Sequence, residues 1–451
     1  MINFGALLSN TSNFLYTYIL IALLIFAGLY FTVRTRGVQF RLFPEALRVL
    51  GEKKKDGKDI SSFQALMIST ASRVGTGNIA GVANAIIAAT VIGGYGAVFW
   101  MWLLALIGAA SAFIESTLAQ CYKEKHGDNW VGGPAYYIQK ALGSRFFGVV
   151  FAVLLIACFA YGFNALQAYN AGSALQYYLP GYSESVWPAV VGAALALLTG
   201  LCIFGGVRRI SAITSGIVPV MAAIYIALGL FITVKNIGQV PYMLSMIVSQ
   251  AFDPKAMFAG IGASCIMQGI KRGLYSNEAG MGSTPHAHAM AKVKRPHEQG
   301  VVAMTGVFID TFVVLTMTAL VVISTLYAGN GILSAGAAEG VSKANMAQLA
   351  FGTVLGSRAG SMFVAVCLLF FAFSTILSWN FFGRLNVSWL LGEKAVGVYS
   401  VLAIGFIFLG SCLSNDLVWE LADLFNQLMV LPNVLALVTL GGLVAAACRR
   451  K

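Results

Sequence analysis

The feature that most constrains this chain is a series of apolar stretches, each long enough to form a helix that crosses a lipid bilayer. A transmembrane α-helix needs about 20 consecutive, mostly apolar residues. Eleven stretches meet this requirement, at residues 14–34, 61–89, 95–121, 145–178, 187–204, 211–234, 255–291, 299–327, 357–391, 395–413 and 418–447. Only 10% of the residues are charged, whereas a soluble domain carries about a quarter. We therefore expect an all-α polytopic membrane protein in a lipid bilayer.

The lysines and arginines divide unequally between the two sets of loops. One set holds 22 of the 29 basic residues: Arg34, Arg36, Arg41, Arg48, Lys53, Lys54, Lys55, Lys58, Lys123, Lys125, Lys140, Arg145, Arg208, Arg209, Lys292, Lys294, Arg295, Arg384, Lys394, Arg449, Arg450 and Lys451. The other set holds only Lys235, Lys255, Lys343 and Arg358. Cytoplasmic loops carry the excess of positive charge in membrane proteins. The N-terminus is therefore predicted outside and the C-terminus in the cytoplasm, and the net charge of +12 needs no nucleic acid to explain it.

Two similar segments lie at corresponding positions in two halves of the chain. Residues 73–81 and 272–280 both follow the pattern R-x-x-x-x-N-x-A-G, five spans apart and thus in opposite membrane orientations. Interrupted helices at matching positions are the best sequence indication of a transporter's binding site. We expect an extra N-terminal helix and a basic loop in 1–59, a first repeat of core helices 1–5 in 60–234, and a second, inverted repeat of core helices 6–10 in 235–451. The less apolar stretches 236–252 and 338–353 are predicted to be short helices or loops at one membrane face.

Glycines indicate where core helices 1 and 6 are interrupted. Gly75, Gly77 and Gly273 weaken helix continuity near the middle of the membrane. Free amides at such a break attract a carboxylate, and free carbonyls attract an ammonium group or a small cation. A pair of breaks therefore suits a zwitterion. The alternative interpretation is close helix packing, because Gly77 and Gly81 also form a G-x-x-x-G pattern.

Charged side chains inside the membrane are functional candidates. Five such residues lie within or near the spans: Arg73, Arg272, Glu278, Asp310 and Glu115. Charges at this depth are usually paired. Arg73 and Arg272 act either as a gate or brace, or in purely structural ion pairs, and Asp310 is also a candidate proton carrier. Glu420 and Asp423, near the outer end of the last span, are expected in solvent.

The sequence lacks the patterns of a metal site or a catalytic site. His286 and His288 form H-x-H beside a basic loop, which we interpret as a cytoplasmic helix end and not a metal site. The seven cysteines include no C-x-x-C and are interpreted as packing residues. No nucleophile motif appears either, so an enzyme is not expected.

Two other core helices carry polar groups that could face a ligand. Phe163, Gln167 and Asn170 recur at i, i+4 and i+7 and share one helix face. They either contact a small ligand or form interhelical hydrogen bonds. Ser374 and Thr375 interrupt an apolar run, where two hydroxyls either bind a hard cation together with carbonyls or bond back to the preceding turn.

Several segments resemble one family of membrane transporters. The run Gly93-Gly94-Tyr95-Gly96-Ala97-Val98-Phe99-Trp100-Met101-Trp102 is similar to the signature of the alanine or glycine:cation symporters (sodium:alanine symporters) of the amino acid-polyamine-organocation superfamily. Residues 74–78, 132–137 and 276–280 resemble other segments of that family. The resemblance implies a leucine-transporter fold of two inverted five-helix repeats. It also implies sodium-coupled uptake of alanine or glycine across a bacterial or archaeal cell membrane.

The resemblance also implies roles for particular residues. The resemblance implies that the amides of core helix 1 hold the substrate carboxylate. The implied substrate-binding residues are Gly75, Thr76, Gly77 and Asn78 on core helix 1, Phe163 and Gln167 on core helix 3, and Gly273, Leu274, Ser276 and Asn277 on core helix 6. Its sodium ligands are Ala71, Val74, Phe371, Ser374 and Thr375. Arg73 stands where relatives on this fold have a small residue beside a second sodium site, which predicts a single sodium ion. The alternative is a proton-coupled transporter of small amino acids that uses Asp310 or Glu278 as the proton carrier.

Overall fold

The computed structural model describes residues 10–52, 60–89, 94–127, 129–179, 181–258, 264–334 and 345–449. Lys53, Lys54, Lys55, Lys58, Gly93, Lys343, Arg450 and Lys451 from the predicted patterns lie outside the described residues. The described chain consists mainly of helices, with one antiparallel hairpin of two strands. Its elements, with η marking a π- or 3₁₀-helical segment, are η1 (Leu15–Leu20), α2 (Ile21–Arg34), α3 (Val38–Arg41), α4 (Phe43–Gly51), α5 (Ser62–Arg73), η2 (Thr76–Asn78), α6 (Ala80–Ala89), α7 (Gly96–Cys121), β1 (Glu124–His126), β2 (Asn129–Val131), α8 (Pro134–Ala141), α9 (Arg145–Ala157), η3 (Cys158–Phe163), α10 (Asn164–Ser173), η4 (Ala174–Tyr177), η5 (Tyr182–Glu184), α11 (Trp187–Ile203), α12 (Gly206–Lys235), η6 (Ile237–Gln239), α13 (Val240–Ala251), α14 (Pro254–Met257), α15 (Cys265–Asn277), α16 (Pro285–Met290), α17 (Pro296–Phe308), η7 (Ile309–Leu315), α18 (Thr316–Val322), η8 (Ile323–Tyr327), α19 (Met346–Leu355), α20 (Ser357–Leu391), α21 (Ala395–Ser411) and α22 (Asn415–Arg449).

Each predicted apolar stretch contains helix, so the all-α polytopic class is confirmed. Seven helices in the described part of the chain are long and apolar enough to cross a membrane: Asn10–Arg34, Gly96–Cys121, Arg145–Tyr177, Arg208–Lys235, Pro296–Tyr327, Ser357–Leu391 and Asp416–Gly442. Two further stretches form the shorter apolar helices α11 and α21. The last two, 61–89 and 255–291, are helices interrupted near their middles.

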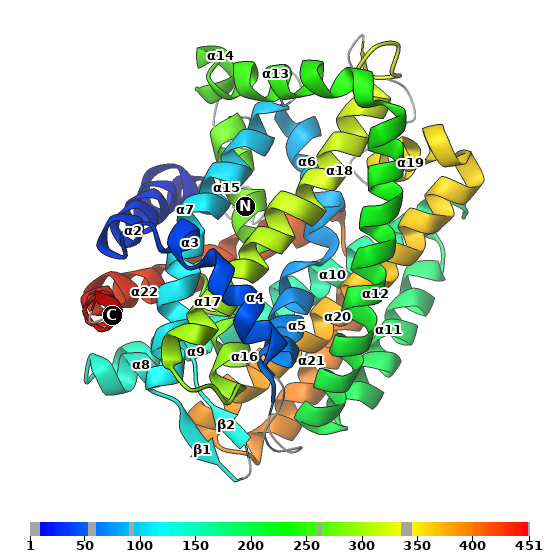
Figure 1. Ribbon diagram of the computed structural model, residues 1–451. Coiled ribbons are helices and arrows are strands. Elements are labelled where there is room, and N and C mark those ends of the chain that lie inside the picture. The colour runs from blue at the N-terminus through cyan, green and yellow to red at the C-terminus, as the bar shows by residue number, and fades with distance from the viewer. Residues whose placement is uncertain are drawn as a thin grey trace.

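The two ends of the helix bundle carry different short elements. Helices α13 and α14 lie across one end, and the β1–β2 hairpin lies at the opposite end (Figure 1). Lys125 on β1 and Lys255 on α14 come from the two predicted sets of loops, and they lie at opposite ends as alternating loops require. Short helices or loops were predicted in 236–252 and 338–353, and in the described residues α13 and α19 are short helices there.

The interrupted helices lie among the long ones in the centre of the fold. Helix α7 packs against α15 and α17, while α5 packs against α12, α17 and α20. Four ionisable side chains are buried at this centre, with exposed fractions of 1% for Arg73 and 0% for Glu115, Glu278 and Asp310. In a helix bundle of this composition, such burial marks the polar interior where a site is formed.

Local sequence explains where two of these central elements begin. Ser61 and Gln64 form a reciprocal capping box that starts α5. Gly133 adopts a φ of 143° before Pro134 at the first turn of α8. A Cβ atom at Gly133 would lie 2.5 Å from the imidazole of His286, so only glycine fits between the hairpin and α16. Hydropathy did not indicate α8, because its 8 residues are too few to form a membrane-length stretch.

Candidate functional site

The first helix break lies between α5 and α6, as predicted. Helix α5 ends at Arg73, Gly75 is extended, and a short 3₁₀ turn over 76–78 precedes α6. A Cβ atom at Gly75 would lie 2.7 Å from Thr375 Oγ1, and one at Gly77 would lie 2.8 Å from the ring of Tyr275. These glycines therefore allow α20 and α15 to approach the break closely. Gly75 and Gly77 therefore lie at the helix interruption and also allow close helix packing, so both interpretations apply to the same two residues.

Helix α10 presents its predicted polar face to this break. The amide of Thr76 donates to Gln167 Oε1 (3.3 Å), and Asn170 Nδ2 donates to Thr76 Oγ1 (2.8 Å). Phe163, at the end of η3, is fully buried and packs edge-on against the ring of Tyr275 with centroids 5.0 Å apart. The three residues predicted to share one face therefore meet both interrupted helices.

The second break lies between α15 and α16, five residues later than Gly273. Helix α15 continues through Gly273 to Asn277, and Glu278 then adopts a left-handed conformation with φ 53°. A Cβ atom at Gly273 would lie 3.3 Å from Met101 Cα. The prediction that Gly273 interrupts the helix is therefore wrong, because this glycine allows α15 to pack closely on α7. Leu274 likewise lies inside α15 and is fully buried.

Ser276 and Asn277, at the last turn of α15, do lie at the second break. The Ser276 hydroxyl donates to both carboxylate oxygens of Asp310, at 3.0 and 2.9 Å. Asn78 Nδ2, from the first break, donates to Asp310 Oδ1 at 2.7 Å. Asp310 on η7 also accepts a hydrogen bond from the Thr311 hydroxyl (3.0 Å). One buried carboxylate therefore joins the two breaks.

Arg73 forms a second connection between the breaks. Its guanidinium donates to the carbonyl oxygens of Asn277 (2.8 Å) and Ala303 (3.0 Å) and to the hydroxyl of Thr284 (2.9 Å). These partners lie on both sides of the second break and on α17. Of the two predicted roles, this geometry favours a brace made through carbonyl groups.

Arg272 pairs with a different helix. Its Nη2 atom lies 2.7 Å from Asp423 Oδ2, and its guanidinium carbon lies 4.2 Å from the ring centroid of Trp419. Asp423 is only 5% exposed. The expectation that Asp423 is in solvent is therefore wrong, because α22 turns this carboxylate toward the basic residues of α15.

Two of the predicted sodium ligands, Ala71 and Thr375, meet where α5 packs against α20. Thr375 Oγ1 donates to the carbonyl oxygen of Ala71 at 2.7 Å, so its hydroxyl crosses between the two helices. Ser374 Oγ instead bonds back to the carbonyl of Phe371 (3.1 Å). Val74, one residue beyond α5, is also fully buried here. Carbonyl and hydroxyl oxygens are the ligands that a hard cation prefers, so the chemistry of this set fits sodium.

Glu115 and the two histidines stabilise the segment between α15 and α16. Glu115 accepts backbone hydrogen bonds from Gly280 (3.3 Å) and Gly282 (3.1 Å). His286 Nε2 lies 2.8 Å from Asn386 Nδ2, and His288 Nδ1 lies 2.9 Å from Gln299 Oε1. Both histidines lie in the short helix α16, which ends at Met290 before the basic loop, and both are fully buried. No group of three His, Cys, Asp or Glu side chains able to hold a metal occurs in the described ranges.

Two aromatic residues of the site were not predicted. Tyr275 OH accepts a hydrogen bond from Gln167 Nε2 (2.9 Å). The ring centroid of Trp379 lies 4.5 Å from that of Phe163. A signal existed for Trp379, which follows Thr375 by four residues and so shares its helix face. Tyr275 lies within the second repeated segment, directly before Ser276.

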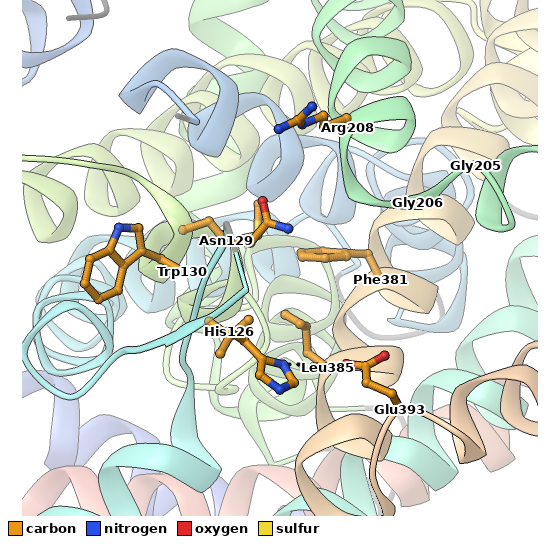
Figure 2. A pocket seen from close by; sticks show the side chains of 11 residues that line it. His126, Asn129, Trp130, Gly205, Gly206, Arg208, Phe381, Leu385 and Glu393 are labelled. Carbon is orange, nitrogen blue, oxygen red and sulfur yellow. Dashed lines mark ion pairs between the residues drawn. The ribbon is translucent and has the colours of Figure 1, made fainter. Parts of the chain in front are cut away.

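A cavity of about 570 Å³ opens at the hairpin end of the bundle. Its lining includes Met290 at the end of α16 and Phe381 and Leu385 on α20. In Figure 2, His126 of the hairpin faces Glu393, and His126 Nδ1 lies 3.6 Å from Glu393 Oε1. The cavity is thus bordered by the helices that continue from the second break and from the predicted sodium ligands.

Comparison with solved structures identifies the type of fold. The structure of MhsT in complex with L-phenylalanine aligns with a TM-score of 0.60 at 12% sequence identity, covering 84% of this chain and 88% of that chain. At this identity the likeness shows the fold alone. It confirms the leucine-transporter type of fold that the resemblance implied.

Comparison of the sequence with family models and characterised proteins identifies the family. The amino-acid carrier protein AlsT of Bacillus subtilis is 41% identical over 440 residues, covering 97% of this chain and 90% of the relative. The sodium/alanine symporter AgcS of Methanococcus maripaludis is 36% identical over 454 residues, covering 98% and 96%. The model of the sodium:alanine symporter family matches residues 1–450. The chain therefore belongs to the sodium:alanine symporter family and is a secondary active transporter.

Proposed function

We propose that this transporter takes up alanine and glycine together with one sodium ion, by alternating access around the two helix breaks. One observation carries the proposal. A Cβ atom at Gly75 would lie 2.7 Å from Thr375 Oγ1 and 2.9 Å from Gln167 Nε2. The candidate ligands for the ion and for the substrate therefore meet at a single residue of the first break, where binding of one is able to affect the other.

The proposed substrate site uses the backbone amides of the first break. The amides of Gly75, Thr76 and Gly77 are assigned to the carboxylate, and the Gly75 amide then exchanges its present acceptor, Asn78 Oδ1 (3.1 Å), for the substrate. Gln167, which accepts from the Thr76 amide, yields this position to the substrate. The last turn of α15, at Ser276 and Asn277, faces the ammonium group.

The size limit of this site follows from its aromatic wall. Phe163 packs against both Tyr275 and Trp379, with ring centroids 5.0 and 4.5 Å apart. A filled, well-packed wall does not accept added methylenes without strain. Side chains no larger than a methyl group are therefore favoured, which is the size of glycine and alanine.

The proposed stoichiometry follows from Arg73. Its guanidinium already donates to the carbonyl oxygens of Asn277 and Ala303. Its positive charge also repels a second cation beside the first break. The sodium ion is assigned to Ala71, Val74, Phe371, Ser374 and Thr375, between α5 and α20.

One sodium ion per substrate provides enough driving force. A hundredfold gradient of a zwitterion requires about 2.7 kcal/mol. One cation entering across about 100 mV releases about 2.3 kcal/mol, and a tenfold cation gradient adds about 1.4 kcal/mol. No second ion is needed for concentrative uptake.

The proposed membrane arrangement has eleven spans in a bacterial or archaeal cell membrane, with the N-terminus outside. The span 14–34 is the extra helix, 60–234 holds the first five-helix repeat, and 235–451 holds the inverted second one. The uneven distribution of basic residues and the placement of the two breaks, one in each half, support this arrangement.

Proton coupling is the second candidate, and Asp310 is the observation that favours it. This buried carboxylate accepts hydrogen bonds from Asn78 of one break and Ser276 of the other. Its protonation would alter contacts with both breaks together, which is what a coupling proton must do.

Uptake of labelled alanine into proteoliposomes under imposed gradients distinguishes the two candidates. We expect an inward sodium gradient to drive accumulation, and an inward proton gradient in sodium-free buffer to drive none. Accumulation that follows the proton gradient and does not depend on sodium would reject sodium coupling and favour proton coupling through Asp310. A protein that accumulates neither alanine nor glycine under any gradient would reject the proposed substrates.

A further inference from the structure

Glu278 has a left-handed backbone conformation that non-glycine residues rarely adopt. It follows the last turn of α15 with φ 53°, and the only other non-glycine residue with positive φ in the described ranges is Arg36. Glycine is the usual residue at this position after a helix, because it adopts the left-handed region without a steric penalty. A glutamate at this position adds a carboxylate that glycine lacks, and this carboxylate makes several buried contacts.

The Glu278 carboxylate accepts hydrogen bonds from three separate elements. The Ser72 hydroxyl of α5 shares its proton between the Ser69 carbonyl (2.8 Å) and Glu278 Oε2 (3.0 Å). Ser283 Oγ of the second break donates to the same Oε2 atom at 2.6 Å. Trp379 Nε1 of α20 donates to Oε1 at 2.6 Å. The two oxygens therefore hold different helices, and a shift of α5 against α20 must lengthen at least one of these hydrogen bonds.

Ser72 and Trp379, the two partners of Glu278 on α5 and α20, lie near the proposed sodium ligands in the sequence. Ser72 directly follows Ala71, whose carbonyl oxygen accepts the hydrogen bond from Thr375. Trp379 lies four residues after Thr375, on the same face of α20. The carboxylate thus spans the same pair of helices that the ion joins, one turn away along α20.

Trp379 also belongs to the aromatic wall of the substrate site. Its ring centroid lies 4.5 Å from Phe163 and 6.0 Å from Tyr275. The indole N–H points to Glu278 while the ring packs on the wall. Any change in the spacing of α5 and α20 that moves the carboxylate therefore moves a side chain of the wall.

We propose that Glu278 is the positioning residue that transmits sodium binding between α5 and α20 to the substrate site through Trp379. This inference rests on the proposed sodium-coupled function and adds the residue that carries the coupling. In this proposal Glu278 is not one of the ligands assigned to the ion or to the substrate. Its role is to make the orientation of Trp379 depend on the distance between the two helices.

The test measures thermodynamic coupling, defined as the ratio of the alanine dissociation constants in sodium-free buffer and at saturating sodium. In sodium-free buffer the sodium site is empty, and at saturating sodium it is full. Weaker sodium binding alone therefore does not change the ratio. Coupling between two sites is typically 5- to 150-fold. Labelled alanine is bound at equilibrium to the purified, full-length protein, with choline replacing sodium.

Two variants and one matched control carry the test. Ser72→Ala removes the hydrogen bond from α5, and Glu278→Gln keeps the size of the side chain but removes its charge. Ser69→Ala is the control, because Ser69 is buried on the same helix and its hydroxyl bonds only to the Leu66 carbonyl among the described partners. We expect the ratio to fall at least fivefold in Ser72→Ala and Glu278→Gln and to stay at the wild-type value in Ser69→Ala.

The opposing outcomes separate the inference from the function on which it rests. An unchanged ratio in both Ser72→Ala and Glu278→Gln overturns the inference, as does a loss of alanine affinity that is equal at both plateaus. A wild-type protein whose alanine affinity ignores sodium overturns the proposed sodium coupling itself. Thermal unfolding of each variant verifies that it is folded.

Discussion

Arg73 at the end of α5 donates its Nε–H to the carbonyl oxygen of Asn277 at the end of α15, over 2.8 Å. These two residues end the first halves of the two interrupted helices. A helix end in a membrane has carbonyls that lack intrahelical partners and must be satisfied by other groups. The arginine of one break thus caps the helix of the other, which makes the two breaks a single structural unit.

Replacing Arg73 with lysine tests this unit. Lysine keeps the positive charge but has a compact ammonium group that cannot reproduce the planar fork of guanidinium donors. Hydrogen bonds to charged groups contribute roughly 1.5–3 kcal/mol each, so losing one or two should lower initial uptake rates at least tenfold. Arg48→Lys, at an exposed position on α4, should transport like the wild type. An Arg73→Lys protein with normal uptake would contradict the bracing role.

Alanine at Gly75 should abolish most transport. The new Cβ atom would lie 2.7 Å from Thr375 Oγ1, and overpacking of this kind typically costs about 1–3 kcal/mol. We expect uptake of labelled alanine to fall more than tenfold while the protein still elutes as a folded species. Gly216→Ala is the control, because nothing lies within 4 Å of the position that its new Cβ atom would take. Equal activity of the two variants would show that the close approach at Gly75 is unimportant.

The double variant Ser374→Ala, Thr375→Ala should lose sodium dependence. It removes both hydroxyl ligands proposed for the ion, leaving only carbonyl oxygens. The expected result is residual alanine uptake that is slow and identical in sodium and choline buffers. Ser378→Ala changes a hydroxyl on the same helix that forms no hydrogen bond among the described residues, and it should keep full sodium stimulation. Sodium-stimulated uptake in the double variant would refute the ligand assignment.

Truncation of Phe163 should broaden the range of substrates. Removing its ring from between Tyr275 and Trp379 leaves room for extra methylenes, so Phe163→Ala should accept valine and leucine as competitors of labelled alanine. A buried Phe→Ala change costs about 3–5 kcal/mol, so the control must carry a similar penalty. Phe351→Ala, also fully buried but on α19, should be destabilised without any change in selectivity. An unaltered competition profile for Phe163→Ala would count against the aromatic wall.

Much of the fold could be predicted from the sequence, because the bilayer limits the choices. A chain with so few charges must satisfy its backbone within helices, and the apolar stretches therefore mark helices with small errors at their ends. The first break was also visible, because Gly75 and Gly77 lie close together in one span. The elements that were missed are short and polar, such as the β1–β2 hairpin and α8, for which hydropathy has no signal.

The second break lies inside the predicted segment 272–280, but its exact residue and the burial of several ionisable side chains could not be predicted from the sequence. Glu278 holds the left-handed position at the end of α15 although glutamate is not a residue that indicates it, and Gly273, which looked like the break, serves packing. Asp423 and His286 have partners on helices distant in the sequence, and His288 has its partner on the next helix, α17. Their burial depends on tertiary contacts with Arg272, Asn386 and Gln299, which no local pattern reveals.

The most direct measurement of the proposed mechanism is a simultaneous flux of ²²Na⁺ and ¹⁴C-labelled alanine into the same proteoliposomes, with the membrane potential clamped. We predict a ratio of one sodium ion per alanine molecule, because the positive charge of Arg73 lies beside the first break and one ion is sufficient to drive uptake. A ratio of two, or alanine entry without accompanying sodium, would contradict it.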